Sequence, residues 1–328
     1  MSLEKKKKVE KFTNSLDFFR ESIEKIQKSS NNLSVSPNVF LQTLLFRPIA
    51  KDSDRVFSEK YKEVCGFANE NYELMVYKRG EDLDQGDLTL YLWLISKLDE
   101  NFRCSFSKRE ALIGCNRDAS KANYDWLDKS LDRLMFVNIK FFQREIQGRG
   151  KRIYKGSLLS WIKEDSSIES KNKMTVQLTP LSRILRHDKC SFVNIGTKAS
   201  FVRQQVAQYL YNWFKCNNGV NGFHFKKDVM IHKLRRENEP DKAFVQRLKR
   251  TGLDPLVKLG ILKDYEFEKD SIFLVWDKNF DNKKNKELDT KKAIKSKYGP
   301  KKPVKKVAKK KATKKDDEDF QGHDDWEV

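Results

Sequence analysis

A chain of 328 residues has room for two modest domains with tails, and its charge predicts a polyanionic ligand. Lys and Arg number 67 against 47 Asp and Glu, a formal net charge of +20 that is typical of nucleic-acid-binding proteins. Five scattered cysteines without a CxxC pair argue against a disulfide framework and a zinc site, and no apolar run approaches the roughly 20 residues of a membrane span. With no signal peptide behind the Lys-rich start, we expect a cytoplasmic protein.

Residues 1–33 are predicted to form an amphipathic helix. Its apolar side chains recur at three- and four-residue spacing, and they are Val9, Phe12, Leu16, Phe19, Ile23 and Ile26. This stripe could dock on the chain's own domain. It could also mediate self-association, because a helix this short is marginally stable alone.

A first domain is predicted over residues 34–195. It begins with an apolar helix at 37–46 and two short strands at 61–67 and 72–77. Three helices follow. The first, or lead, helix spans 88–98, the second begins with a capping box formed by Ser107 and Glu110, and the third spans 124–134. Strands from Val137 to Phe142 and from Ile153 onward then flank a Gly-, Arg- and Lys-rich tip, which predicts a hairpin wing. Strands at 158–163 and 174–178 and a helix at 180–187 complete the domain.

Two groups of side chains in this domain are candidates for DNA contact. The start of the third helix offers Asn116, Arg117, Ser120, Lys121 and Asn123. Further along, Asp125, Asp128 and Asp132 would repel a phosphate backbone, so only this end of the helix suits DNA. The wing residues Arg149, Lys151 and Arg152 form the stronger phosphate site.

A second domain is predicted over residues 196–278, with the same order of elements. An apolar-periodic helix spans 201–214, a short helix spans 226–234, and a third begins at Pro240. A hairpin of strands at 261–267 and 272–276 ends the domain. Helix, helix, basic helix and hairpin is the order of a winged helix-turn-helix, so we predict an α+β fold with two winged-helix domains in tandem.

The third helix of the second domain is the best candidate for reading bases. Lys242, Gln246, Lys249 and Arg250 share one face, and Arg247 lies at its margin. Arg and Lys suit guanine and Gln suits adenine in the major groove. The alternative is a solvated basic face, which is common on surface helices.

The tail at 279–328 is predicted to be disordered, because it has almost no apolar residues. Residues 301–315 are Lys-rich and suit the DNA backbone, whereas 316–328 are acidic and include Phe320 and Trp326. The acidic half could fold back on the Lys-rich half, present its aromatic residues to a partner, or only solvate the chain.

The sequence predicts no enzyme, metal site or cofactor. The segment from Gly148 to Lys151 lacks the upstream glycine of a phosphate loop and the Ser or Thr that follows its lysine. The histidines His187, His224, His232 and His323 do not pair into metal-ligand spacings.

The chain resembles the TrfA-type plasmid replication initiators over roughly residues 36–276. The resemblance lies in short matches, namely Pro37-Asn38-Val39-Phe40-Leu41 with Leu45-Phe46, Gly80-Glu81-Asp82-Leu83-Asp84-Gln85-Gly86-Asp87, Ser157-Leu158-Leu159 and Leu259-Gly260-Ile261-Leu262. It implies a bacterial protein that binds repeated origin sites (iterons), helps to open an AT-rich segment and brings in the replicative helicase. It also implies contacts with DnaA and the sliding clamp. Single-stranded DNA is a second candidate ligand beside the double-stranded repeats.

Gln42, Leu45 and Phe46 have the Gln-x-x-Leu-Phe form of a clamp-binding peptide. Such a peptide must be extended and free, whereas these residues fall in an apolar helical pattern, so a place in the core is the competing interpretation. For the whole chain we carry two functional hypotheses: a replication initiator, and a winged-helix transcriptional regulator that represses its own gene. A non-specific DNA-compacting protein is a weaker third.

Overall fold

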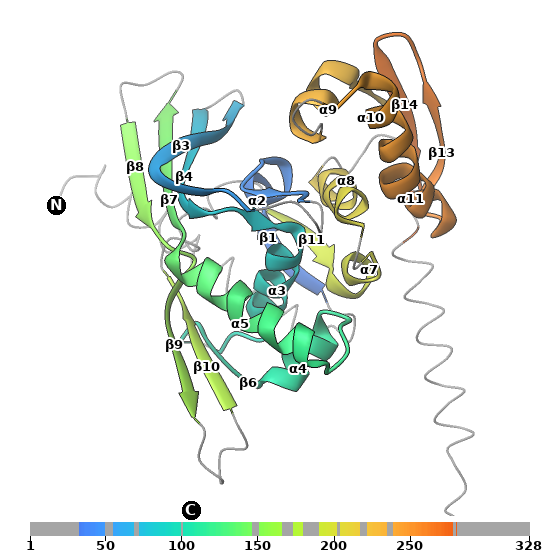
Figure 1. Cartoon of the computed structure of the whole chain (residues 1–328). Helices are drawn as coiled ribbons and strands as arrows, with labels where there is room; N and C mark the ends of the chain where they lie inside the picture. The colour runs from blue at the N-terminus through green and yellow to red at the C-terminus, as the bar shows by residue number, and fades with distance from the viewer. Residues whose placement is uncertain are drawn as a thin grey trace, which may run out of the picture. The chain divides into compact units, whose positions relative to one another are not determined.

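The structure is a computed structural model that describes residues 33–49, 55–68, 72–99, 101–145, 151–165, 173–179, 190–201, 204–216, 222–234, 239–277 and 280 (Figure 1). All of these residues lie in one compact part of the chain, Met1–Lys284. The domain boundary predicted near residue 195 falls inside this part. The amphipathic stripe of residues 9–26, the helix predicted at 180–187 and the charged tail lie outside the described residues.

The described chain is a mixture of helices and small sheets, as an α+β fold requires. It opens with strand β1 (Leu33–Pro37), which pairs antiparallel with β11 (Cys190–Asn194). Helix α2 (Asn38–Gln42) follows, and β2 (Phe46–Arg47) then pairs in parallel with β5 (Leu83–Asp84). The single apolar helix predicted over 37–46 is therefore wrong, because the segment divides into strand end, short helix and strand, and β-pairing outweighs the helical pattern at both of its ends.

A four-stranded antiparallel sheet lies at the left of Figure 1. Its strands, in spatial order, are β3 (Phe57–Ala68), β4 (Tyr72–Glu81), β7 (Asn138–Glu145) and β8 (Lys151–Gly156). The strands predicted at 61–67 and 72–77 are confirmed and are longer than expected.

A first set of elements follows the order helix, strand, helix, helix, strand, strand, and we call it the first unit. It consists of α3 (Gln85–Ser96), β6 (Arg103–Ser107), α4 (Lys108–Gly114), α5 (Lys121–Phe136), β9 (Leu159–Asp165) and β10 (Lys173–Leu178). In its sheet the first strand pairs with the third and the third with the second, giving the order β6-β10-β9. The capping box of Ser107 and Glu110 is present at the start of α4, as predicted.

The wing predicted for this unit needs a correction. The strands that flank residues 146–150 are β7 and β8, and they belong to the four-stranded sheet, where β7 also pairs with β4. The hairpin that pairs with β6 is instead β9–β10. Two hairpins follow α5 in the sequence, and the basic tip makes the first of them look like the wing. Which hairpin pairs with β6 is a long-range property that no local sequence pattern reveals.

The same order and pairing recur in a second unit. It consists of α8 (Gln205–Cys216), β12 (Gly222–Lys226), α9 (Lys227–Leu234), α10 (Asp241–Leu248), the π-helical η2 (Lys249–Leu253), α11 (Asp254–Lys258), β13 (Leu262–Phe267) and β14 (Ser271–Trp276). Its sheet has the order β12-β14-β13, again with the first strand beside the third. Helix α8 begins four residues later than predicted, because the chain first forms the short helix α7 (Ile195–Ala199).

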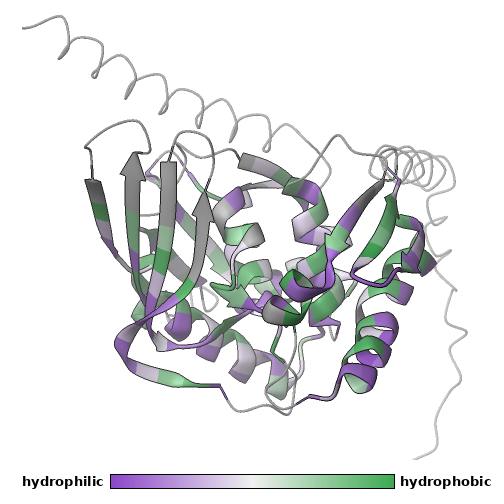
Figure 2. Cartoon of the chain, turned by 90° about the horizontal axis from the view of Figure 1, so that it is seen from above, coloured by the Kyte–Doolittle hydropathy of each residue, from purple (hydrophilic) through white to green (hydrophobic). Residues whose placement is uncertain are grey.

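One continuous apolar core links these elements. It extends from Phe40 through Leu92 of α3 and Leu210 of α8 to Leu274 of β14, all fully or almost fully buried. Helix α3 is buried along almost its whole length and packs against α5, α7 and α8. Along the outer elements of Figure 2, hydrophilic and hydrophobic residues alternate, as elements with a single buried face require.

Candidate nucleic-acid interface

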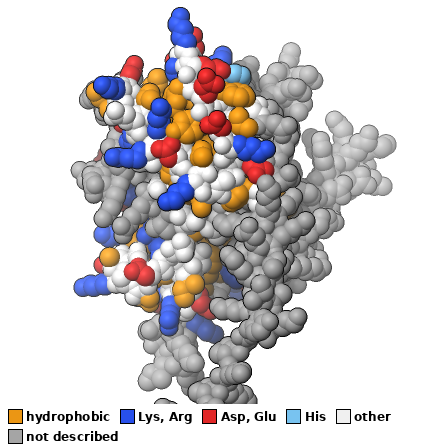
Figure 3. All heavy atoms as spheres, turned by 90° about the vertical axis from the view of Figure 1, so that its right-hand side faces the viewer, with side chains coloured by type: hydrophobic (Ala, Val, Ile, Leu, Met, Phe, Trp, Pro, Cys, Tyr) orange, Lys and Arg blue, Asp and Glu red, His pale blue; other side chains and the backbone are white. Residues whose placement is uncertain are grey.

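Helix α10 is fixed by two core side chains and presents its other side to solvent. Phe244 and Leu248 are buried, whereas Lys242 and Gln246 are exposed. Apolar residues at this spacing turn one face inward, so the polar residues between them must point out. Figure 3 shows Lys and Arg side chains, with acidic ones among them, standing out from the side of the molecule that Figure 1 draws on the right.

The basic face continues past α10 without a break in the helical path. Lys249 and Arg250 open η2 and are exposed, and the hydroxyl of Thr251 donates to the carbonyl of Arg247 at 2.8 Å. Gly252 allows the close approach of α8, since a Cβ there would lie 2.8 Å from the Val206 side chain. The π-helical turn of η2 therefore lies where the chain packs closely against α8. Turns of this kind are frequent at functional sites.

Arg247 is the member of the predicted set that the structure engages elsewhere. Its guanidinium donates to both carboxylate oxygens of Glu239 at 2.7 Å and to the carbonyl of Leu234 at 2.7 Å. A bidentate pair of this kind is among the stronger hydrogen bonds in proteins. Arg247 therefore ties the end of α9 to the start of α10 and is not available for DNA in this arrangement.

The hairpin β13–β14 is held against the helical segment by polar and aromatic contacts. The Lys249 ammonium lies 4.8 Å from the centre of the Phe267 ring, and the Tyr265 hydroxyl donates to Asp254 at 2.5 Å. Burial, followed by the nearby Asp254 carboxylate, raises the pKa of Tyr265 to about 12, so this hydroxyl keeps its proton. The Lys227 ammonium donates to the carbonyls of Glu268 and Lys269 and so fixes the hairpin turn.

In the first unit, two of the residues predicted at the start of the third helix, Arg117 and Asn123, are in contact. Arg117 stacks its guanidinium 3.6 Å from the centre of the Trp126 ring and donates to Asn123 at 3.1 Å. Ser120 is the residue before α5, and Lys121 is exposed in the first turn. Asn116 adopts a left-handed φ of 55° and donates to the carbonyl of Ala199 at 3.3 Å.

The residues predicted to form the wing of the first unit lie elsewhere. Arg149 lies outside the described residues, and Lys151 and Arg152 are in β8, away from the β6-β10-β9 sheet. Sequence reasoning missed the exposed side chains of β9, among them Trp161 and Lys163. The Arg103 guanidinium lies 5.7 Å from the centre of the Trp161 ring. The strand predicted at 158–163 was the sequence signal that could have revealed these exposed side chains.

The clamp-peptide interpretation of Gln42, Leu45 and Phe46 is not retained. Leu45 and Phe46 are 1% and 0% exposed, and Phe46 packs edge-on against Phe40 and beside Tyr91. A partner could reach these anchors only after the core had opened. The competing interpretation, a place in the core, describes these two side chains.

A buried polar cluster joins α3, α7 and α8, and sequence reasoning missed it. The Lys198 ammonium group, 0% exposed, donates to the side-chain oxygens of Gln85 at 2.8 Å and Gln208 at 3.1 Å. Asn212 donates to the same Gln85 oxygen at 2.8 Å. Burial lowers the pKa of Lys198 well below its usual range, and two amide acceptors match the two N–H bonds of a neutral amine.

We expect Lys198 to make the free energy of unfolding depend on pH. The unfolded chain keeps this proton up to about pH 10.4, whereas the folded chain releases it at a lower pH. Between the two pKa values the unfolded state binds more protons, so stability rises by about 1.4 kcal/mol per pH unit from this group. Urea titrations of the unchanged chain and Lys198→Met at several pH values isolate the contribution. Parallel pH profiles for the two proteins would contradict it.

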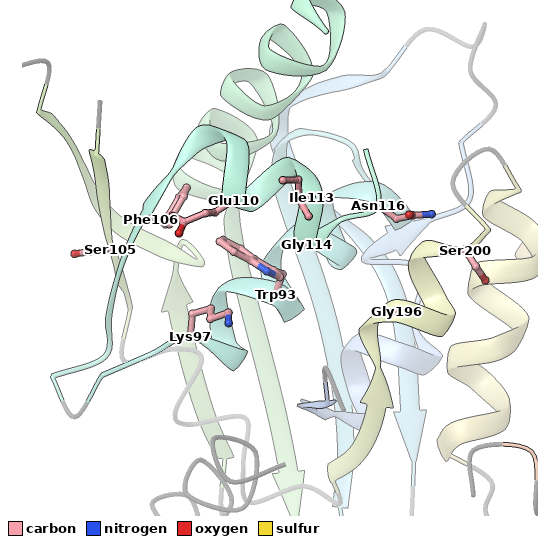
Figure 4. Close-up of a pocket in the computed structure, with 10 residues that line it drawn as sticks. All are labelled: Trp93, Lys97, Ser105, Phe106, Glu110, Ile113, Gly114, Asn116, Gly196 and Ser200. Carbon is pink, nitrogen blue, oxygen red and sulfur yellow. The ribbon is translucent and has the colours of Figure 1, made fainter. Parts of the chain in front are cut away.

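A pocket of about 580 Å³ opens beside α4 (Figure 4). Trp93, Phe106 and Ile113 supply its apolar wall, and Lys97 and Glu110 are its charged residues. The Glu110 carboxylate already accepts from the backbone of Ser107 at 2.7 Å, and burial raises the pKa of the nearby Cys104 thiol to about 12. Within the described residues no cluster of His, Cys, Asp or Glu is arranged to hold a metal ion.

Comparisons with known proteins give only a distant likeness. No protein-family model matches the chain, and no curated protein does. Two solved structures of domains 2 and 3 of RctB, one a selenomethionine derivative, are similar. They are 14% and 11% identical, with TM-scores of 0.49 and 0.48, and the alignments cover 74% and 75% of this chain and 99% of each of those chains. In the described residues, no helix is long and apolar enough to cross a membrane.

Proposed function

We propose that this chain is a non-catalytic replication initiator that binds repeated duplex sites through two winged-helix units. The observation that carries the proposal is the repeated topology, in which both units have the same element order and the same strand pairing. In a winged helix the third helix enters the major groove and the hairpin lies on the flanking backbone. Helices α5 and α10 would then read DNA, and the hairpins β9–β10 and β13–β14 would be the wings.

The two units would divide the work unequally. Lys242, Gln246, Lys249 and Arg250 are exposed and offer donors for base edges. Helix α5 is mixed, because Asp125 and Asp132 are exposed along it. We infer that α10 supplies most of the sequence specificity and that the first unit grips the backbone through Lys121 and the exposed side of β9.

The initiator role rests on the resemblance to TrfA-type proteins and is tested by footprinting. The full chain is incubated with the DNA that surrounds its own gene and treated with a nuclease. Protection of several direct repeats beside an AT-rich segment is expected. Protection of a single promoter site without repeats would favour the alternative, a transcriptional regulator that represses its own gene, and would contradict the initiator proposal. The contacts with helicase and DnaA stay predictions.

Deleting residues 299–328 is expected to leave site-specific binding in place and to reduce its dependence on salt. The deleted segment includes the Lys-rich 301–315, which suits phosphates without reading sequence, and the slope of log K against log salt falls by about 0.9 for each phosphate that is no longer neutralised. Binding titrations of cognate and random duplexes at several salt concentrations measure both quantities. Loss of all binding on deletion would instead favour a non-specific compacting protein.

A further inference from the structure

The four-stranded sheet has one face that the core covers and one that it does not. Val76 of β4 and Phe141 of β7 lie opposite each other and are both 0% exposed. Because side chains alternate along a strand, the neighbours of these residues point to the other side. The register aligns two rows there: Tyr77, Lys140 and Lys155 in one, and Met75, Phe142 and Ile153 in the other. We call this side the outer face.

The outer face interleaves aromatic and basic side chains. The Lys140 ammonium lies 5.3 Å from the centre of the Tyr77 ring, and Arg79, next on the same face, lies 5.8 Å from the Tyr61 ring. Ile153 is 53% exposed, and Arg79 and Lys155 are exposed.

In these two rows, the charge of the described side chains is mainly positive. In the part of the chain that the structure describes, no ion pair involves Arg79, Lys140 or Lys155. Among the side chains that the structure describes in these two rows, Glu63 is the acid, and it lies on the β3 side, opposite Tyr77. The positive charge therefore concentrates toward β7 and β8.

We propose that the outer face binds single-stranded nucleic acid, with bases stacked on Tyr77 and Phe142 and phosphates held by Arg79, Lys140 and Lys155. Aromatic rings that stack with bases beside basic groups that follow the backbone are the two features of single-strand binding sites. Tyr77 and Phe142 are diagonal neighbours on adjacent strands, about 7–8 Å apart, which is within reach of consecutive bases.

The geometry favours a single strand over a duplex and over a protein. Four strands spaced by about 4.8 Å are too wide to enter a major groove about 12 Å across, and the bases of a duplex are not free to stack. Protein interfaces are depleted in lysine, whose ammonium is costly to desolvate, whereas Lys140 and Lys155 lie at the centre and edge of this face. Phosphates would pair with both without full desolvation.

The outer face is separate from the proposed duplex interface, so substitutions can remove duplex binding and single-strand binding independently. Gln246 belongs to α10 and Arg250 to η2, whereas the outer face is built from β4, β7 and β8. The double variant Gln246→Ala/Arg250→Ala is expected to lose cognate duplex affinity and to keep single-strand affinity. Variants of the outer face are expected to do the opposite.

The test titrates the full chain against a fluorescein-labelled oligothymidylate of about 20 nucleotides and follows anisotropy. Tyr77→Leu and Phe142→Leu remove the rings and keep apolar volume, and each is expected to weaken binding roughly 5- to 140-fold, since stacking contributes about 1–3 kcal/mol per base. The matched variants Tyr77→Phe and Phe142→Tyr retain the rings and are expected to bind within about twofold of the unchanged chain. The Lys-rich residues 301–315 add the same background to every variant.

A second arm depends on charge and guards against loss of folding in the ring variants. Lys140→Gln/Lys155→Gln changes two exposed or half-buried side chains and is expected to lower the single-strand salt slope by about 0.7 for each phosphate that these lysines neutralise. Equal affinity of the Leu and ring-retaining variants, together with an unchanged salt slope, would overturn the proposal. A change in molecular mass by light scattering with unchanged single-strand affinity would also overturn it, and would assign the face to a second copy of the chain.

Discussion

Replacing Gln246 or Arg250 by Ala is expected to weaken binding to the cognate duplex by about 1–3 kcal/mol for each substitution. Both side chains are exposed on the face that continues from α10 into η2, and both offer the paired hydrogen-bonding groups that base edges require. A Gln contacting adenine or an Arg contacting guanine loses its whole contribution when truncated. Anisotropy titrations on the footprinted repeat and on a random duplex of equal length measure the effect.

The comparison of the two duplexes assigns the role of each side chain. Loss on the cognate duplex alone indicates base contact, whereas equal loss on both would contradict base reading and indicate phosphate contact. Lys258→Ala provides the matched control, because Lys258 is also an exposed cation, at the far end of the same helical segment. Arg247→Ala is unsuitable as a control, since it breaks the pair with Glu239 that holds α9 and α10 together.

Replacing Asp87 by Ala is expected to lower the free energy of unfolding by about 3–5 kcal/mol. The Asp87 carboxylate is 0% exposed and accepts from Arg133 at 2.8 Å, from the Ser130 hydroxyl at 2.6 Å and from Arg55 at 3.3 Å. Its removal leaves the Arg133 guanidinium buried without its main partner, and it also removes half of the capping box with Asp84 that begins α3. Urea unfolding followed by tryptophan fluorescence measures the loss.

A surface pair provides the control for this experiment. Arg47 contacts Asp82 at 3.4 Å, but its side chain is 52% exposed, so Arg47→Ala is expected to cost less than about 1 kcal/mol. Equal effects of the two substitutions would contradict the burial argument. The helical signal of the Asp87→Ala variant in water shows whether it still folds before denaturant is added.

The elements with local signals were predictable from the sequence. The order of helices and the final hairpin of the second unit follow from apolar spacing and turn residues, and the capping box of Ser107 and Glu110 is recognisable from its own four residues. The exposed face of Lys242 and Gln246 follows from the same spacing. In each case the residues that decide the structure lie within a few positions of one another.

Strand pairings and side-chain contacts between residues far apart in the sequence were not predictable. No local pattern tells that β7–β8 joins β3–β4 and leaves β9–β10 to pair with β6. The segment from Gly80 to Asp87 carries part of the family resemblance, yet its role becomes visible only with Arg55 and Arg133 brought beside it. Lys198 likewise resembles a surface lysine in the sequence, because its partners Gln85 and Gln208 are distant or not recognisable as partners.

The pairing of β1 with β11 can form only after both strands have been synthesised. Leu33 pairs with Asn194 and Pro37 with Cys190, so β1 emerges from the ribosome long before its partner exists. At about 5–20 residues per second, that wait is on the order of ten seconds or more. Until then β1 is an unpaired strand that other chains could join. A fragment that ends before residue 190 therefore retains this open edge however well its helices form.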